Sequence, residues 1–115
     1  MGFIIELRRG QPKARTGRAP GAQPKVGMLE RYVDEGELSS AIQRVGPHRL
    51  PTLAGLEPYR SQKLKSEAVD SMVREIERID LHGLDEAELR VISILLKWGL
   101  LCRADRDLRI GFGGY

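Results

Sequence analysis

The chain has 115 residues and a formal net charge of +3, a length that fits one domain spanning residues 1–115. Its single cysteine, Cys102, excludes an internal disulfide and favours a reducing, cytoplasmic location. The N-terminal residues lack the pattern of a signal peptide and the apolar runs are too short for a bilayer, so we expect no membrane association.

The first predicted element is a strand at residues 2–8, in which Phe3, Ile5 and Leu7 share one face. A second, more exposed strand is predicted with Met28 to Val33 as its core. Between the two strands, residues 8–27 are rich in proline and glycine, which excludes a regular helix or a central strand. The three segments together predict a hairpin with an enlarged loop.

Charge is distributed unevenly along the chain. Six basic residues and no acidic residue occur between Glu6 and Glu30. The rest of the chain then has thirteen basic residues against sixteen acids, so its charge is about −3. The sequence therefore describes a slightly acidic body that carries a basic loop at 8–27.

Helices are expected next. The first follows a capping box formed by Asp34 and Glu37, and it stops at Gly46 before a proline. An irregular connection then extends to Lys65, with leucines as apolar anchors. A clear amphipathic helix begins after Ser66, a residue that favours helix N-caps.

The longest predicted helix begins with a second capping box, formed by Asp85 and Glu88. It is apolar around most of its circumference, so it must pack on two sides: against the sheet, and against the other helices or a second subunit. Trp98 on this helix belongs either to the core or to a dimer face. The chain closes with a half-buried strand in which Leu108, Ile110 and Phe112 alternate with other residues.

These elements predict the α+β class. We expect a small antiparallel or mixed sheet of about three strands, built from the N-terminal hairpin and the C-terminal strand. About three helices would pack on one face of that sheet. The first and last strands are expected to be neighbours.

The basic loop has three alternative interpretations. Its cations could neutralise nucleic-acid phosphates, although residues 8–27 contain no aromatic side chain to stack on a base. They could instead steer an acidic protein partner. The third alternative is a solvated connector without a binding role.

A second candidate contact is Tyr59, next to Arg60, because tyrosine and arginine are enriched at interface hot spots. The alternative is that Tyr59 covers the edge of the core. The histidines and the lone cysteine show no metal-ligand spacing, and no residue pair indicates catalysis, so we expect neither an enzyme nor a cofactor. The candidate partner-binding residues are Arg8, Arg9, Lys13, Arg15, Arg18, Lys25, Tyr59 and Arg60.

Residues 34–115 resemble small bacterial α/β proteins of the polymorphic-toxin immunity type, many of which are uncharacterised. The residues that match a leucine-rich turn, an amphipathic helix and a final strand of that group are Leu53, Leu56, Glu57, Pro58, Tyr59, Met72, Val73, Glu75, Ile76, Phe112 and Gly114. The sequence departs from the pattern at residues 60–62, where the group has Gly-Asp-Thr, and at Tyr115, where it has Asp.

The resemblance implies a non-enzymatic binding role, with inhibition of a toxin as the specific expectation. We therefore expect a monomer or homodimer that neutralises a toxin or enzyme by binding it through an acidic surface of that partner. The alternative is a nucleic-acid-associated accessory protein that uses its basic arm at 8–25 for phosphate contacts.

Overall fold

The computed structural model describes residues 2–9 and 28–114. Its elements, in chain order, are β1 (Phe3–Arg9), β2 (Met28–Asp34), α1 (Glu37–Val45), α2 (Pro51–Ala54), β3 (Ser61–Leu64), α3 (Glu67–Glu77), the 3-10 helix η1 (Leu81–Gly83), α4 (Glu86–Ala104) and β4 (Leu108–Gly114). The α+β class and the positions of the main predicted elements are confirmed.

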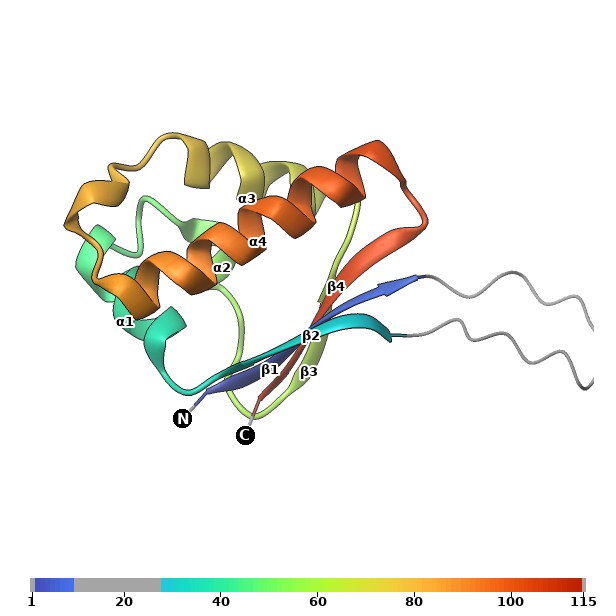
Figure 1. The fold of residues 1–115 in the computed structure, drawn as a ribbon, viewed down its shortest axis with the longest axis horizontal. Helices are drawn as coiled ribbons and strands as arrows, with labels where there is room; N and C mark the ends of the chain where they lie inside the picture. The colour runs from blue at the N-terminus through green and yellow to red at the C-terminus, as the bar shows by residue number, and fades with distance from the viewer. Residues whose placement is uncertain (1, 10–27, 115) are drawn as a thin grey trace, which may run out of the picture.

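The strands of the described residues form one antiparallel sheet in the order β2-β1-β4-β3. The helices lie over one face of this sheet (Figure 1). Ile5, near the middle of β1, pairs with Tyr32 on one side and with Phe112 on the other. The first and last strands are thus neighbours, as predicted, and they form the centre of the sheet.

The described residues contain more strands and helices than the sequence predicted. The described residues contain four strands and four α-helices, whereas about three of each were expected. Both additions, α2 and β3, lie in the segment that was expected to be an irregular connection. Strand β3 forms because its backbone pairs with β4, although Leu64 is its only buried residue.

The core consists of apolar residues that recur at alternate positions in the strands and at helical spacing in the helices. Ile5, Ile110 and Phe112 project from the sheet toward the helices and are buried. Helix α4 contacts α1 and α3 as well as β4, which confirms its predicted packing on two sides. Trp98 is 2% exposed, and its indole N–H donates to Glu30 Oε1 at 3.2 Å. It is therefore a core residue, and the dimer-face alternative for Trp98 is wrong.

The two predicted capping boxes have different outcomes. At α4 the Asp85 carboxylate accepts from the Glu88 amide at 2.8 Å, and the Glu88 carboxylate accepts from the Asp85 amide at 3.0 Å. At α1 the N-cap is Gly36 in a left-handed conformation, so the predicted box is absent. The Asp34 carboxylate instead accepts from the amide of Leu38 at 2.8 Å, which still supplies an acceptor to the helix start.

Across residues 2–9 and 28–114, none of the helices has the length and apolar character needed to cross a bilayer.

Candidate functional site

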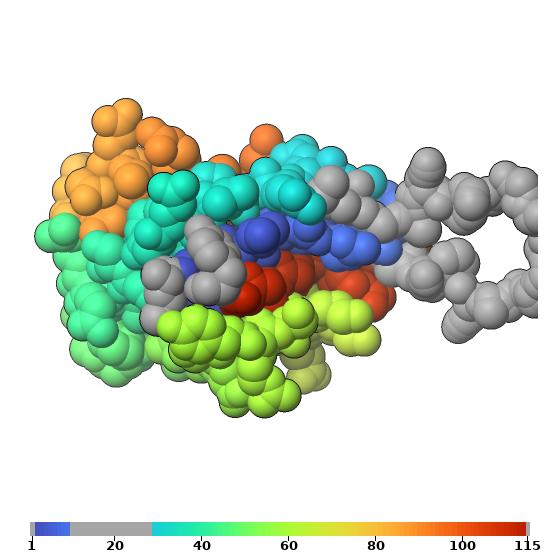
Figure 2. Space-filling view, turned by 90° about the horizontal axis from the view of Figure 1, so that it is seen from below, coloured from blue at the N-terminus to red at the C-terminus, as the bar shows by residue number. Residues whose placement is uncertain are grey.

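The side of the sheet that the helices leave uncovered is the main candidate site. Figure 2 shows β2, β1, β4 and β3 side by side on this surface. We call it the open face. Its described residues are Ile4, Glu6, Arg8, Arg31, Val33, Ser61, Lys63, Arg109, Gly111 and Gly113.

Strand register arranges these residues in rows across the sheet, because directly opposed residues of antiparallel strands lie on the same face. One row runs Arg31, Glu6, Gly111 and Lys63. The next row runs from Val33 through the central strands to Ser61 and is uncharged. A charged row and an uncharged row therefore lie beside each other.

A groove of about 430 Å³ lies on the open face, and residues of all four strands line it. Gly111 and Gly113 lie on its floor, where they contribute no side chain. Its size falls within the range of about 300–1,000 Å³ that is typical of ligand sites. The other lining residues are Ile4, Glu6, Arg8, Arg31, Ser61, Gln62, Lys63 and Phe112.

Glu6 organises the charges of the groove. Its carboxylate accepts from Arg8 Nη1 at 2.6 Å and from Arg31 Nη2 at 2.9 Å. Partial burial opposes ionisation, but the hydrogen bonds from the two arginines outweigh it and lower the pKa of Glu6. Among the described residues that line the groove, three cations face one carboxylate, so the groove is positively charged.

The structure separates the predicted contact residues into two groups. Arg8 lines the groove, and Arg9 lies beyond it, where its Nη1 pairs with Asp105 Oδ2 at 2.9 Å. Arg9 pairs in the sheet with Leu108, the first residue of β4. Arg60 lies at the other end of β4, since its carbonyl accepts from the Gly114 amide at 3.1 Å. Lys13, Arg15, Arg18 and Lys25 lie outside the described residues.

Tyr59 is 67% exposed, so its ring does not simply cover the core edge. Its φ of 65° is in the left-handed region, which is uncommon for a bulky residue. Arg60 beside it donates from Nη1 to Glu57 Oε1 at 2.8 Å. These two residues form an exposed corner that is distinct from the groove beside Arg8.

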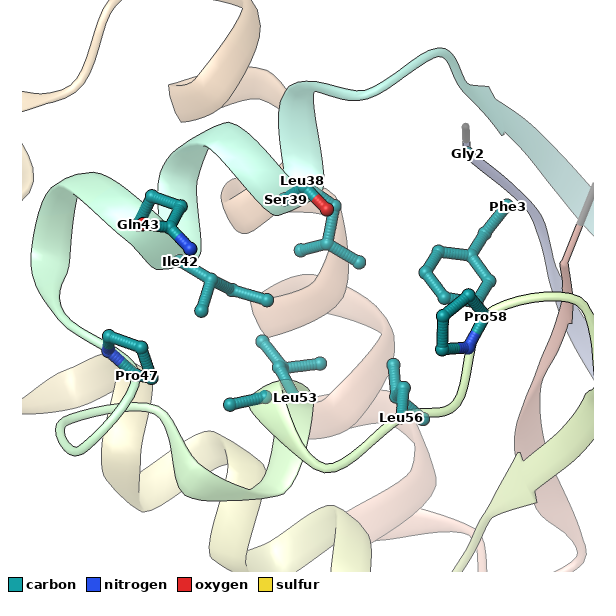
Figure 3. Close-up of a pocket in the computed structure, with 11 residues that line it drawn as sticks. Gly2, Phe3, Leu38, Ser39, Ile42, Gln43, Pro47, Leu53, Leu56 and Pro58 are labelled. Carbon is teal, nitrogen blue, oxygen red and sulfur yellow. The ribbon is translucent and has the colours of Figure 1, made fainter.

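A smaller apolar pocket of about 210 Å³ lies near this corner. Leu38 and Ile42 of α1 face Leu53 and Leu56 across it, and Phe3 and Pro58 close one side (Figure 3). The lining residues carry no charged side chain within the described residues. The pocket can accept an apolar group, but its lining offers no charge to select one partner chemistry.

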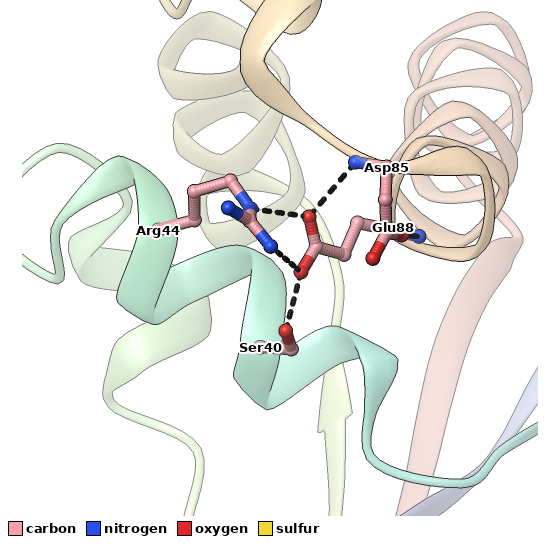
Figure 4. Close-up of polar contacts among 4 residues, drawn as sticks. All are labelled: Ser40, Arg44, Asp85 and Glu88. Carbon is pink, nitrogen blue, oxygen red and sulfur yellow. Dashed lines mark hydrogen bonds and ion pairs between the residues drawn. The ribbon is translucent and has the colours of Figure 1, made fainter.

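The buried carboxylate of Glu88 lies in the helix layer. It is 1% exposed and accepts from Arg44 Nε at 2.6 Å and from the hydroxyl of Ser40 (Figure 4). The hydrogen bonds from Arg44 and Ser40 lower its pKa to about 2. A carboxylate held ionised by three partners joins α1 to the start of α4.

Cys102 offers no reactive thiolate, because burial raises its pKa to about 11. The described part of the chain also contains no cluster of three metal-ligating side chains. Neither observation adds a chemical site to the open face.

Sequence reasoning did not identify Arg31, Lys63, Gly111 and Gly113 as a site. The signal was present in the last strand, where the alternation of buried residues assigns both glycines to the opposite face. The contribution of Lys63 was hidden because residues 61–64 were expected to be irregular.

Comparison of the chain with protein-family models, with curated proteins and with solved structures finds no match. The function must therefore be argued from the open face itself.

Proposed function

We propose that this chain is a non-enzymatic protein-binding module that recognises an acidic surface of its partner through the open face. The observation that supports this best is the positively charged groove on an uncovered sheet face, lined by Arg8, Arg31 and Lys63. A protein surface rich in aspartate and glutamate complements it in charge.

The sequence of residues 8–27 adds to the same argument. This segment joins β1 to β2, and Arg8 belongs to both the segment and the groove. All charged residues of this segment are basic. The charge of this segment therefore has the same sign as the charge of the groove.

The specific role we propose is inhibition: the module covers the active site of a toxin or another enzyme. The resemblance to immunity-type proteins supports this role. Binding and inhibition are separate claims, and each needs its own measurement.

The binding claim is tested with the tagged full chain and a charge-reversed variant carrying Arg31→Glu and Lys63→Glu. Wild-type protein should enrich a protein partner from a nuclease-treated native lysate, and the variant should lose at least tenfold of that enrichment. Lys97→Glu, on the exposed side of α4, is the matched control and should retain the partner. Equal recovery by wild type and the charge-reversed variant would contradict the use of the open face.

The inhibition claim is tested with the purified partner. A one-to-one complex measured by calorimetry should coincide with loss of the partner's enzymatic activity. A partner that stays fully active when saturated would remove the inhibitory role and leave only the binding role.

A nucleic-acid-associated role remains the second candidate, supported by the same cations. Sheets that read single-stranded RNA stack bases on aromatic side chains. Phe3, Tyr32 and Phe112 point toward the helices, and the described residues of the open face include no aromatic side chain. Binding to random oligonucleotides that weakens steeply with salt and requires Lys63 would favour this candidate over the first.

A further inference from the structure

Gly111 and Gly113 occupy interior positions of β4, a central strand of the sheet. Glycine weakens a strand interior because it loses more conformational freedom than other residues and packs no side chain. Two such residues on one face of one strand therefore need an explanation.

The fold does not require either glycine. Neither has a positive φ among the described residues. A Cβ on Gly111 would lie 3.7 Å from Arg8 Cδ, and a Cβ on Gly113 would lie 3.9 Å from the Ile4 carbonyl oxygen, which are ordinary contacts. Gly114 is different, because a Cβ there would lie 2.2 Å from the Tyr59 backbone nitrogen.

The two glycines do have an effect on the surface. They leave the floor of the groove without side chains between the flanking strands β1 and β3. Glycine within a strand often marks a place where a ligand approaches the backbone closely. Aromatic rings are known to pack over glycines in sheets, where they replace the missing side-chain contacts.

We propose that the groove binds an acidic segment of the partner protein by receiving one aromatic side chain over Gly111 and Gly113. This inference rests on the proposed function and adds to it the chemistry of the partner's anchor. The ring would contact the glycine backbone and Ile4, while acidic residues beside it would pair with Arg31 and Lys63.

The residues around the floor of the groove favour an aromatic side chain as the partner's anchor over a charged side chain alone. Ile4 supplies an apolar contact in the uncharged row, next to Gly113. The side chain of Arg8 lies next to Gly111, Arg31 lies one strand further away beyond Glu6, and guanidinium groups stack favourably on aromatic faces. The same cations repel another copy of this basic face, so the charge pattern argues against a second copy of the chain as the occupant.

The test uses two synthetic acidic peptides of eight residues, binding to the full chain by fluorescence anisotropy. One peptide contains six glutamates and two phenylalanines, and the other has serines in place of the phenylalanines. Wild-type protein should bind the phenylalanine peptide at least tenfold tighter. Gly111→Val and Gly113→Val should remove this preference without weakening binding of the serine peptide.

Gly111→Ala is a milder variant for the case in which valine disturbs the sheet. Gly83→Ala is the matched control, because a Cβ at Gly83 meets no atom within 4 Å and the residue is remote from β4 in the sequence. Thermal unfolding of every variant distinguishes a blocked groove from a damaged fold. A preference reduced by Gly111→Ala and kept by Gly83→Ala, with no loss of thermal stability in either variant, would support the proposal.

Each failure has its own meaning. If both peptides bind equally and the glycine variants change nothing, the aromatic anchor is wrong while charge-based protein binding stands. If neither peptide binds, or a random oligonucleotide binds tighter than both, the proposed function fails together with the anchor. If sedimentation shows a dimer that Gly113→Val dissociates, the occupant is a second copy and the proposal is overturned.

Discussion

The two faces of the sheet use the same four strands of the described chain in opposite ways. Toward the helices, Ile5, Ile110 and Phe112 are almost fully buried. On the open face, their immediate neighbours in sequence are Ile4, charged residues and glycines. Because side chains alternate along a strand, stability and recognition can be assigned to alternate residues, and single substitutions can separate the two.

The largest effect is expected at Phe112, whose ring packs edge-to-face on Phe3 with centroids 5.9 Å apart. Phe112→Ala should lower the free energy of unfolding by about 3–5 kcal/mol, through lost burial and the cavity left behind. Chemical denaturation measures this loss. Gly111→Ala, one residue away, should raise stability by about 0.5–1 kcal/mol; similar losses at the two positions would contradict the division between faces.

Glu88 tests the polar part of the helix layer. Glu88→Gln should lower the free energy of unfolding by about 1.5–3 kcal/mol at pH 7, because it weakens hydrogen bonds to a charged group. The folded state holds the pKa of Glu88 near 2, below its usual 4.5. Its stabilising contribution is therefore present above about pH 4.5 and is lost as the pH falls toward 2.

The pH dependence of this difference is the decisive measurement. Denaturation of wild type and Glu88→Gln between pH 7 and pH 2 should show two curves that converge at the acidic end. A constant gap across the whole range would mean that the charge of Glu88 contributes nothing to stability. Ser40→Ala, which removes one donor to the same carboxylate, should give a smaller gap of the same sign.

Gly99 lies where α4 packs closely against α3, so its lack of a side chain matters for packing. A Cβ at this position would lie 2.5 Å from Val73 Cγ2 and 3.0 Å from Met72 Cε. Gly99→Ala should therefore lower the free energy of unfolding by about 1–3 kcal/mol through overpacking of α4 against α3. Thermal unfolding checks this, with Gly83→Ala expected to stay within about 0.5 kcal/mol of wild type.

The smallest effect on stability is expected on the open face itself. Lys63→Glu should change the free energy of unfolding by no more than about 0.5 kcal/mol, as is usual for exposed surface positions. Its effect should appear in binding to acidic partners instead. A large loss of stability in this variant would show that the open face also holds the fold together.

The periodic elements could be predicted because each one follows a simple repeat. Helix α3 places apolar residues at helical spacing, α4 is a long and mostly apolar segment that begins with a capping box, and β4 alternates buried and outward residues. Strand β3 could not be predicted because Ser61–Leu64 has no alternating apolar pattern, and its pairing comes from β4, a strand more than forty residues later in the chain. The cap of α1 was predicted wrongly because the helix begins at Glu37, after the N-cap Gly36, and the Glu37 carboxylate accepts from the Tyr32 hydroxyl and the Glu35 amide instead.

The candidate site was only partly predictable for the same reason. Arg8 was selected from charge alone, and it does line the groove. Arg31 and Lys63 lie in one row across the sheet, at its two edges, only through the strand order, which no local pattern specifies. Tyr59 was selected as a contact residue and is exposed, but the sheet holds it at the opposite end from Arg9.

The pairing of β1 with β4 has a consequence for how the protein is made. The ribosome must add about 100 residues after β1 before β4 exists, which takes roughly 5–20 s at typical synthesis rates. During that interval β2 is the one native partner available to β1 among the described strands, and the other edge of β1 is an open template for wrong partners. The chain therefore completes the middle of its sheet last, and newly synthesised copies are most prone to aggregation until β4 emerges.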